Sequence, residues 1–189
     1  MSVELVVSIA LAVGLAAAVG FRVFLPLLVV SAAAFTGHLE LSNGFEWLGT
    51  RGALVMLSVA TVLEVGAYYI PAVDNLLDVL ATPAALIAGI VISAAVMVDL
   101  PPLVRWATAI IAGGGVAGLT QAATALLRTK STVFTGGLAN PVVATAELGG
   151  ALLVSLLALL APLAALVLIV AFCWVAARLL RRKRSRTQR

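Results

Sequence analysis

The sequence predicts an all-α membrane protein, a polytopic bundle of five or six transmembrane helices arranged as an internal repeat of inverted topology. The first observation is composition. Hydrophobic residues make up 63% of the 189 residues, charged residues make up 11%, and the mean hydropathy is +1.19. A soluble domain of this length needs far more charge to cover its surface. The second observation is several apolar runs of about 18 residues or more, the length that spans a bilayer.

The third observation is a pair of short motifs that each occur twice. Phe-Thr-Gly at 35–37, followed by His and Leu, returns at 134–136, followed by Gly and Leu. Gly-Ala-Leu at 52–54 returns at 150–152. One such match in so apolar a chain would be noise, but two matches in the same order and at nearly the same offset indicate an internal duplication.

The first apolar run, at 5–35, is too long for one perpendicular span. Pro26 lies near its centre, close to Arg22. Because proline removes a backbone donor and crowds the preceding turn, we expect a kinked or discontinuous helix there. The polar stretch at 38–50 predicts a loop, and residues 51–70 predict a second span.

The remaining elements follow from the same patterns. We expect a third, shorter span at 83–98, a fourth span at 103–127, a second loop at 128–141 and an apolar stretch at 142–180. Pro162 interrupts the last stretch, which forms either two short spans or one long kinked helix.

The Asp-Leu-Pro-Pro sequence at 99–102 is the plainest break in the chain. It divides the protein into a first unit at 1–98 and a second unit at 99–180, followed by a basic tail at 181–189. Because the first unit contains three crossings, the second unit begins on the opposite side of the membrane. The repeat therefore has inverted topology, with its two Phe-Thr-Gly copies on opposite faces.

More than half of the twelve Lys and Arg residues lie between Arg178 and Arg189, directly after an apolar segment. This arrangement is typical of a cytoplasmic end that contacts anionic lipid headgroups, and it is much less typical of a nucleic-acid site. We therefore expect a protein of the cell (inner) membrane with a cytoplasmic C-terminus and no nucleic-acid partner. The distribution of positive charge favours six spans over five. So small a bundle buries little surface, which favours a homodimer.

Glu64 is the sharpest candidate for a functional residue, because it lies in an apolar span between Leu63 and Val65. An unpaired carboxylate in hydrocarbon costs several kcal/mol, so it takes a proton, meets a partner or faces a water-filled cavity. Glu64 is either a structural tether to Arg22 or to backbone donors, or a proton-titrating or cation-binding group. Arg22 lies in the middle of an apolar run and needs a partner of its own, for which Glu64 and Glu147 are the first choices.

A second candidate site lies in the second unit. Asn140-Pro141 is a helix-start signature, with Asn as the cap and Pro at the first position. The positive end of that helix dipole would also explain Glu147 without any further function. The preceding Thr135, Gly136 and Gly137 predict backbone amides that approach an anion, although a single Gly-Gly pair is a weak signal.

Asp74, Asn75 and Asp78 form a third candidate site. A helical turn would place Asp74 and Asp78 on one side, with Asn75 adjacent. Oxygen ligands of this kind suit a hard cation, whereas the same spacing is common at solvated helix ends. The sequence therefore leaves the question of a bound metal open.

The sequence supports an enzyme poorly, and a membrane enzyme that acts through carboxylates alone is the less favoured alternative. The single histidine, His38, has no obvious set of accompanying ligands, and no nucleophile motif or phosphate-binding loop is present. The single cysteine, Cys173, excludes an intramolecular disulfide. Aromatic residues are too few and too scattered to suggest a cofactor site, so we expect neither a catalytic residue nor a cofactor.

Three ordered stretches carry a resemblance to a known family. They are residues 20–26, then Glu64 with residues 70–78, then residues 135–141 with Glu147. The chain resembles the family catalogued as domain of unknown function 4126 from about residue 14 to residue 162. The resemblance implies no activity. This sequence differs from the family pattern at one place, where Tyr68 and Tyr69 replace the acidic and basic residues that the resemblance implies.

These features together predict a small membrane transporter or channel-like carrier that is coupled to protons or cations and has an unknown substrate. Polar groups from both units would meet near the middle of the bilayer. The alternative is a non-transporting membrane protein with a structural, assembly or lipid-organising role, whose glycines and internal charges serve helix packing.

Overall fold

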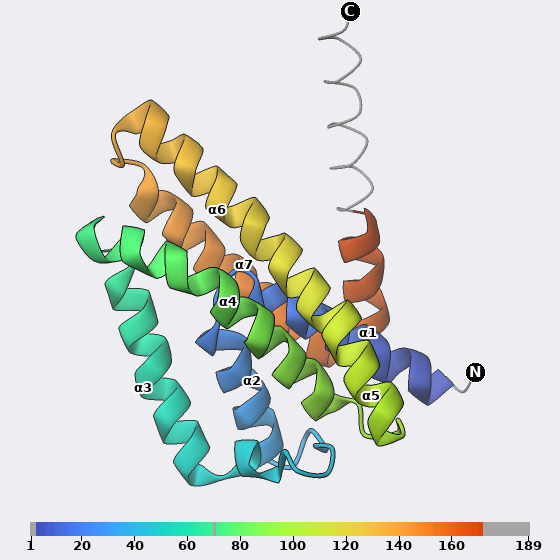
Figure 1. The fold of residues 1–189 in the computed structure, drawn as a ribbon. Helices are drawn as coiled ribbons and strands as arrows, with labels where there is room; N and C mark the ends of the chain where they lie inside the picture. Colours follow the sequence, from blue (N-terminus) through green and yellow to red (C-terminus); the bar gives the residue numbers. More distant parts are fainter. Residues whose placement is uncertain (1–2, 70, 172–189) are drawn as a thin grey trace, which may run out of the picture.

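The structure is a computed structural model that describes residues 3–69 and 71–171; the side chains of 71–79 lie outside that description. Within the described residues every regular element is helical (Figure 1). The elements are α1 (Val3–Val19), α2 (Phe24–Phe35), η1 (Glu46–Gly49), α3 (Arg51–Ala67), α4 (Pro71–Val96), α5 (Pro102–Thr108), the π-helix η2 (Ala109–Gly114), α6 (Gly115–Thr135) and α7 (Asn140–Leu160), followed by a helix at Pro162–Ala171.

The long first apolar run is broken, as the sequence predicts. Helix α1 ends at Val19 and α2 begins at Phe24, so Arg22 lies in the connection between them. In Figure 1 the two helices run in different directions from this connection. The break leaves the backbone groups of two helix ends near the centre of the molecule.

The structure corrects the predicted boundaries of two spans. Helix α4 begins at Pro71 and continues through Pro83, where a span was expected to begin. The fourth span is longer than predicted, because one continuous helix runs from Pro102 to Thr135. Residues 128–135, expected in a loop, are therefore helical; the chain leaves the helix only at Gly136, whose φ of +61° is a left-handed conformation that glycine adopts without strain.

The last apolar stretch contains a break at Ala161, whose φ of −147° and ψ of 69° are not helical. Helix α7 ends before this residue, and the next helix begins at Pro162. Of the two arrangements that the sequence left open, the structure therefore contains two successive helices. The basic tail at 181–189 lies outside the described residues.

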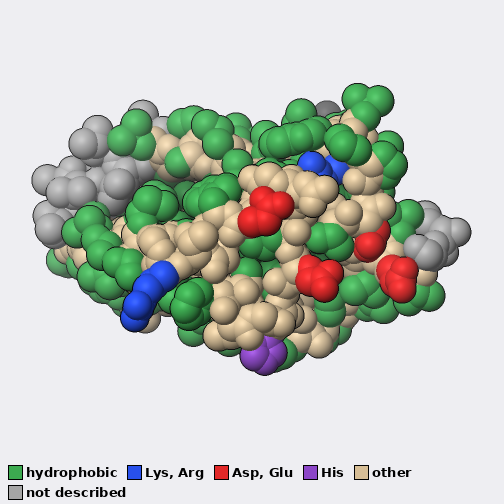
Figure 2. Space-filling view, turned by 90° about the horizontal axis from the view of Figure 1, so that it is seen from below, with side chains coloured by type: hydrophobic (Ala, Val, Ile, Leu, Met, Phe, Trp, Pro, Cys, Tyr) green, Lys and Arg blue, Asp and Glu red, His purple; other side chains and the backbone are tan. Residues whose placement is uncertain are grey.

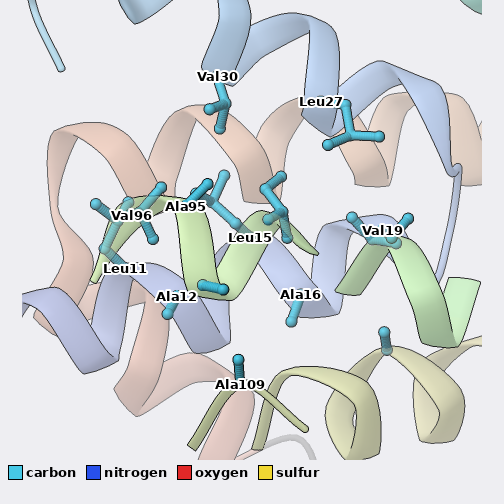
Figure 3. Packing of buried hydrophobic residues seen from close by; sticks show 14 of the residues in the cluster. Leu11, Ala12, Leu15, Ala16, Val19, Leu27, Val30, Ala95, Val96 and Ala109 are labelled. Atoms are coloured by element: carbon cyan, nitrogen blue, oxygen red, sulfur yellow. The ribbon is translucent and has the colours of Figure 1, made fainter. Parts of the chain in front are cut away.

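Helix α1 lies at the centre of the bundle and packs against α4, α6 and α7. Figure 3 shows its side chains, including Leu11, Leu15 and Val19, between the surrounding helices. Small residues such as Ala12 and Ala16 fill the other positions and are buried. Alanines at a helix contact let two backbones approach closely, which is the usual way that helices associate in lipid.

The outside of the bundle is apolar. The helices at Pro102–Thr135 and Asn140–Leu160 are long and apolar enough, by length and composition, to cross a membrane. Large apolar side chains are exposed on α3, α6 and α7, among them Val62, Leu63, Leu119, Leu126, Leu153 and Leu160. Figure 2 shows hydrophobic side chains over much of one face, together with several Asp and Glu side chains and a His. A helical bundle with this surface is compatible with a membrane protein.

Thr50 caps helix α3. Its Oγ1 accepts a hydrogen bond from the Ala53 backbone N–H at 3.2 Å. We expect Thr50→Ala to lower the free energy of unfolding by about 0.5–2 kcal/mol, because this N–H loses its acceptor. Reversible unfolding of the purified protein in detergent measures the change. Thr129→Ala, at an exposed position inside α6, is the control, and an equal loss in both variants would contradict a capping role.

Candidate functional site

A cluster of buried polar side chains surrounds the connection between α1 and α2. Its members, called the charge cluster below, are Arg22, Glu64, Tyr68, Arg128 and Glu147, all of them at most 9% exposed. They come from the α1–α2 connection, α3 and the residue after it, α6 and α7. The charge cluster therefore brings together segments from both halves of the chain.

A close approach of backbones positions Arg22 beside α6. At Gly20, an added Cβ would lie 2.6 Å from the Ala117 carbonyl oxygen of α6. A larger residue would push the end of α1 away from α6. The glycine thus places the connection that carries Arg22 against the helix that carries Arg128.

The centre of the charge cluster is the carboxylate of Glu147. Arg128 donates to it through both Nε, at 2.9 Å from Oε1, and Nη2, which binds Oε2. Arg22 Nη2 lies 3.6 Å from the same Oε2 and donates to the Ala144 carbonyl oxygen at 2.9 Å. One carboxylate therefore serves two guanidinium groups, and the fork-like pairing with Arg128 fixes its orientation.

Tyr68 lies between the two guanidinium groups. The Cζ atom of Arg22 is 3.8 Å from the centre of the tyrosine ring, and that of Arg128 is 4.0 Å from it. The negative face of an aromatic ring attracts a cation, and the attraction is larger where water is excluded. Tyr68 thus separates two like charges and attracts both of them.

Glu64 lies on the other side of Arg22, where it caps α2. Its Oε1 accepts from the Val23 N–H at 2.8 Å and its Oε2 from the Phe24 N–H at 3.1 Å. Val23, the residue at the N-cap of α2, has an apolar side chain that accepts no hydrogen bond from these N–H groups. The sequence suggested that Glu64 is tethered either to Arg22 or to backbone donors. In the structure Glu64 accepts from backbone donors, and Arg22 pairs with Glu147 instead.

The described members of the charge cluster include two basic and two acidic side chains, and part of the Arg22 guanidinium is unmatched. Among the described residues, Arg22 and Arg128 contribute two positive charges, and Glu64 and Glu147 can contribute two negative ones. Arg22 Nε and Nη1, however, are buried and have no hydrogen-bond partner in the described part of the chain. These two nitrogens can therefore donate hydrogen bonds to a further acceptor, such as an anion.

The second predicted site is a separate, local turn. Thr135 Oγ1 accepts from the Ala139 N–H at 3.1 Å, and the Asn140 side chain bonds to Thr132. Gly136 and Gly137 both have positive φ, as a tight turn requires. The turn is largely exposed and lies at the far end of α6, about two helical turns beyond Arg128. The structure does not bring it to the charge cluster.

The third predicted site has a helical backbone, since 74–78 belongs to α4. Asp74 and Asp78 are thus one turn apart, as the sequence predicts. The side chains of Asp74, Asn75 and Asp78 lie outside the described part of the chain. Elsewhere in the described residues, His, Cys, Asp and Glu form no group of three or more that could hold a metal ion.

Sequence reasoning identified three members of the charge cluster, Arg22, Glu64 and Glu147, and missed two. Arg128 was assigned to a loop, where a basic residue needs no partner. The signal that could have found it was the absence of glycine and proline before Gly136, which extends the helix. Tyr68 was noted only as a departure from a family pattern.

Comparison with known protein families identifies a family to which the chain is similar. The family described as Domain of unknown function (DUF4126) matches residues 9–182 of the chain. No curated protein matches the chain, and no solved structure matches it. The match covers every member of the charge cluster.

Proposed function

We propose that this chain, which belongs to the family described as Domain of unknown function (DUF4126), is a small integral membrane carrier with the charge cluster as its substrate and proton site. One observation carries the proposal. Two guanidinium groups and two carboxylates are buried together at a broken helix, within a bundle whose outer surface is apolar. Ionisable groups inside a membrane bundle are costly, and they mark substrate paths and proton relays.

The proposal includes an inverted repeat of units 1–98 and 99–180. The segment between α2 and α3 and the turn between α6 and α7 follow the two Phe-Thr-Gly copies, and they lie at opposite ends of the molecule in Figure 1. In carriers with inverted repeats, broken helices place their ends at a central site. The α1–α2 connection is such a break, and groups from both units surround it.

We place this carrier in the cell (inner) membrane with six spans, a cytoplasmic C-terminus and a homodimeric assembly. The basic residues after position 177 support the orientation and contact with anionic lipid. The dimer rests on the small size of the bundle. The proposed function of the charge cluster requires neither this orientation nor a dimer.

A second candidate function rests on the closed pair of Arg128 and Glu147. This fork-like pair is buried, and a buried pair of this kind holds helices in one arrangement. A non-transporting structural, assembly or lipid-organising protein would need nothing more. The unmatched donors of Arg22 favour the carrier, because helix packing gives them no role.

A flux screen separates the two functions. Purified full-length protein is placed in liposomes, and the fluxes of Na⁺, K⁺, nitrate, acetate and protons are measured for the wild type and Glu64→Gln. We expect the wild type to transport at least one solute above protein-free liposomes, and we expect Glu64→Gln to change that flux. The exposed Glu40 provides the matched control, Glu40→Gln. Wild-type flux equal to that of protein-free liposomes, or unaffected by Glu64→Gln, contradicts the carrier.

A further inference from the structure

Arg105 of α5 is a buried cation outside the charge cluster. The residue is 8% exposed, and its Nε is buried without a hydrogen-bond partner in the described part of the chain. No Asp or Glu of the described residues lies within ion-pairing distance of it, whereas Arg22 and Arg128 share Glu147. A buried charge without a partner is costly, and native proteins satisfy it with an opposite charge or ordered water. The described chain therefore leaves the charge of Arg105 without an anion.

A single peptide group connects Arg105 to a carboxylate. Arg105 Nη2 donates to the Asn43 carbonyl oxygen at 3.4 Å, which is long for a charged donor. The N–H of the next residue, Gly44, donates to Glu46 Oε2 at 2.8 Å. Because both bonds belong to one peptide group, Nη2 and Oε2 lie at most about 9 Å apart. This separation is too large for an ion pair, but a short zwitterion can bridge it.

The residues around Arg105 are typical of a membrane surface. Helix α5 and the segment that contains η1 lie toward the same end of the molecule (Figure 1). Trp106 and Trp47 are exposed there, and the Trp106 ring centre lies 5.9 Å from that of Phe45. Exposed indole rings favour the level of the lipid headgroups. Leu103, on the same helix, is 83% exposed and offers an apolar surface to an acyl chain.

Resting on the membrane location proposed above, but not on the carrier function, we propose that Arg105 and Glu46 bind a phospholipid headgroup that carries a phosphate and a primary ammonium. The chemical class is phosphoethanolamine. Its phosphate oxygens accept from the Arg105 guanidinium, which forms charge-assisted hydrogen bonds with such groups. Its ammonium donates to the exposed carboxylate of Glu46, which can accept further hydrogen bonds besides that of Gly44. The two opposite charges of the site match those of the headgroup.

The acidic surroundings exclude other headgroups. Figure 2 views the molecule from below and shows several Asp and Glu side chains on that face. An anionic headgroup with a glycerol in place of the ammonium brings a negative charge toward Glu46 without a compensating cation. A choline headgroup keeps the positive charge, but its trimethylammonium has no N–H to donate. The site therefore selects ethanolamine over both.

Native mass spectrometry of lipid binding to the purified full-length protein in detergent tests the proposal. Lipids with identical acyl chains and ethanolamine, glycerol or choline headgroups are compared. The wild type is expected to bind the ethanolamine lipid at least about tenfold more tightly than the other two. Arg105→Gln is expected to weaken ethanolamine-lipid binding about tenfold, because the phosphate loses its cation. Glu46→Gln is expected to abolish the preference for ethanolamine over glycerol.

Two variants control the measurement. Arg51→Gln and Glu40→Gln make the same chemical changes at exposed positions next to the segment that contains η1, and both are expected to match the wild type. If Arg105→Gln does not fold, Glu46→Gln decides, because its side chain is exposed and glutamine can still accept from Gly44. A preference for ethanolamine that persists in Glu46→Gln overturns the proposal.

The remaining outcomes are also decisive. A wild type that binds the three lipids equally, or Arg51→Gln that loses as much affinity as Arg105→Gln, overturns the site. Soluble phosphoethanolamine that displaces the lipid at the concentration of the lipid itself shows a soluble ligand and overturns the lipid assignment. Headgroup preference without flux in liposomes removes the carrier and keeps the site, whereas flux without this preference removes the site and keeps the carrier.

Discussion

Glu147→Gln is expected to lower the free energy of unfolding by about 3–5 kcal/mol, because it leaves two buried cations without their shared anion. Arg128 binds both oxygens of Glu147, and Arg22 lies 3.6 Å from one of them. Glutamine has nearly the same shape and keeps an acceptor oxygen, so the loss reports mainly the charge. Reversible unfolding of the purified protein in detergent measures it.

The control for this prediction is Glu40→Gln, the same chemical change at an exposed position, which is expected to alter the stability little. A double-mutant cycle adds a test of the pairing itself. Arg128→Gln is expected to cost less in the Glu147→Gln background than in the wild type, because the two side chains share one interaction. Independent, additive losses would show that the fork-like pair does not hold α6 and α7 together.

Gly113→Ala is expected to destabilise the protein by about 1–3 kcal/mol, because the added methyl group has no room at the contact between η2 and α4. A Cβ at Gly113 would lie 2.7 Å from the carbonyl oxygen of Gly89, which belongs to the backbone of α4. Backbone atoms inside a helix move only if the whole helix moves. The unfolding midpoint in detergent gives the size of the effect.

Gly115→Ala is the matched control, two residues further along the same continuous helix. A Cβ at Gly115 meets no atom within 4 Å, and the residue is exposed. This substitution is expected to be neutral or to stabilise the helix by up to about 1 kcal/mol, since alanine loses less backbone freedom than glycine on folding. Equal stability of the two variants would contradict a close contact between η2 and α4 at Gly113.

Several features of the fold were predicted from local sequence. The apolar composition predicted an all-α bundle with an apolar exterior. Pro26, four residues after Arg22, predicted the break between α1 and α2. The predicted boundaries were wrong where a polar stretch was taken as a loop. Residues 128–135 are polar in part but contain no glycine or proline, so backbone hydrogen bonding continues to Thr135. Pro83 gave the same kind of error, because it was expected to begin a helix but lies inside α4.

The sequence by itself determined which groups needed partners. A carboxylate at 64, a guanidinium at 22 and a carboxylate at 147 all lie in apolar runs, and an unpaired charge there is too costly to persist. Only the tertiary structure decided which residues are the partners of these three charged groups. Arg22 shares Glu147 with Arg128 because α1 packs against α6 and α7, and Glu64 binds the start of α2 because α3 packs against α2. Burial cost is a property of each residue in its segment, whereas pairing depends on distances between segments far apart in the chain.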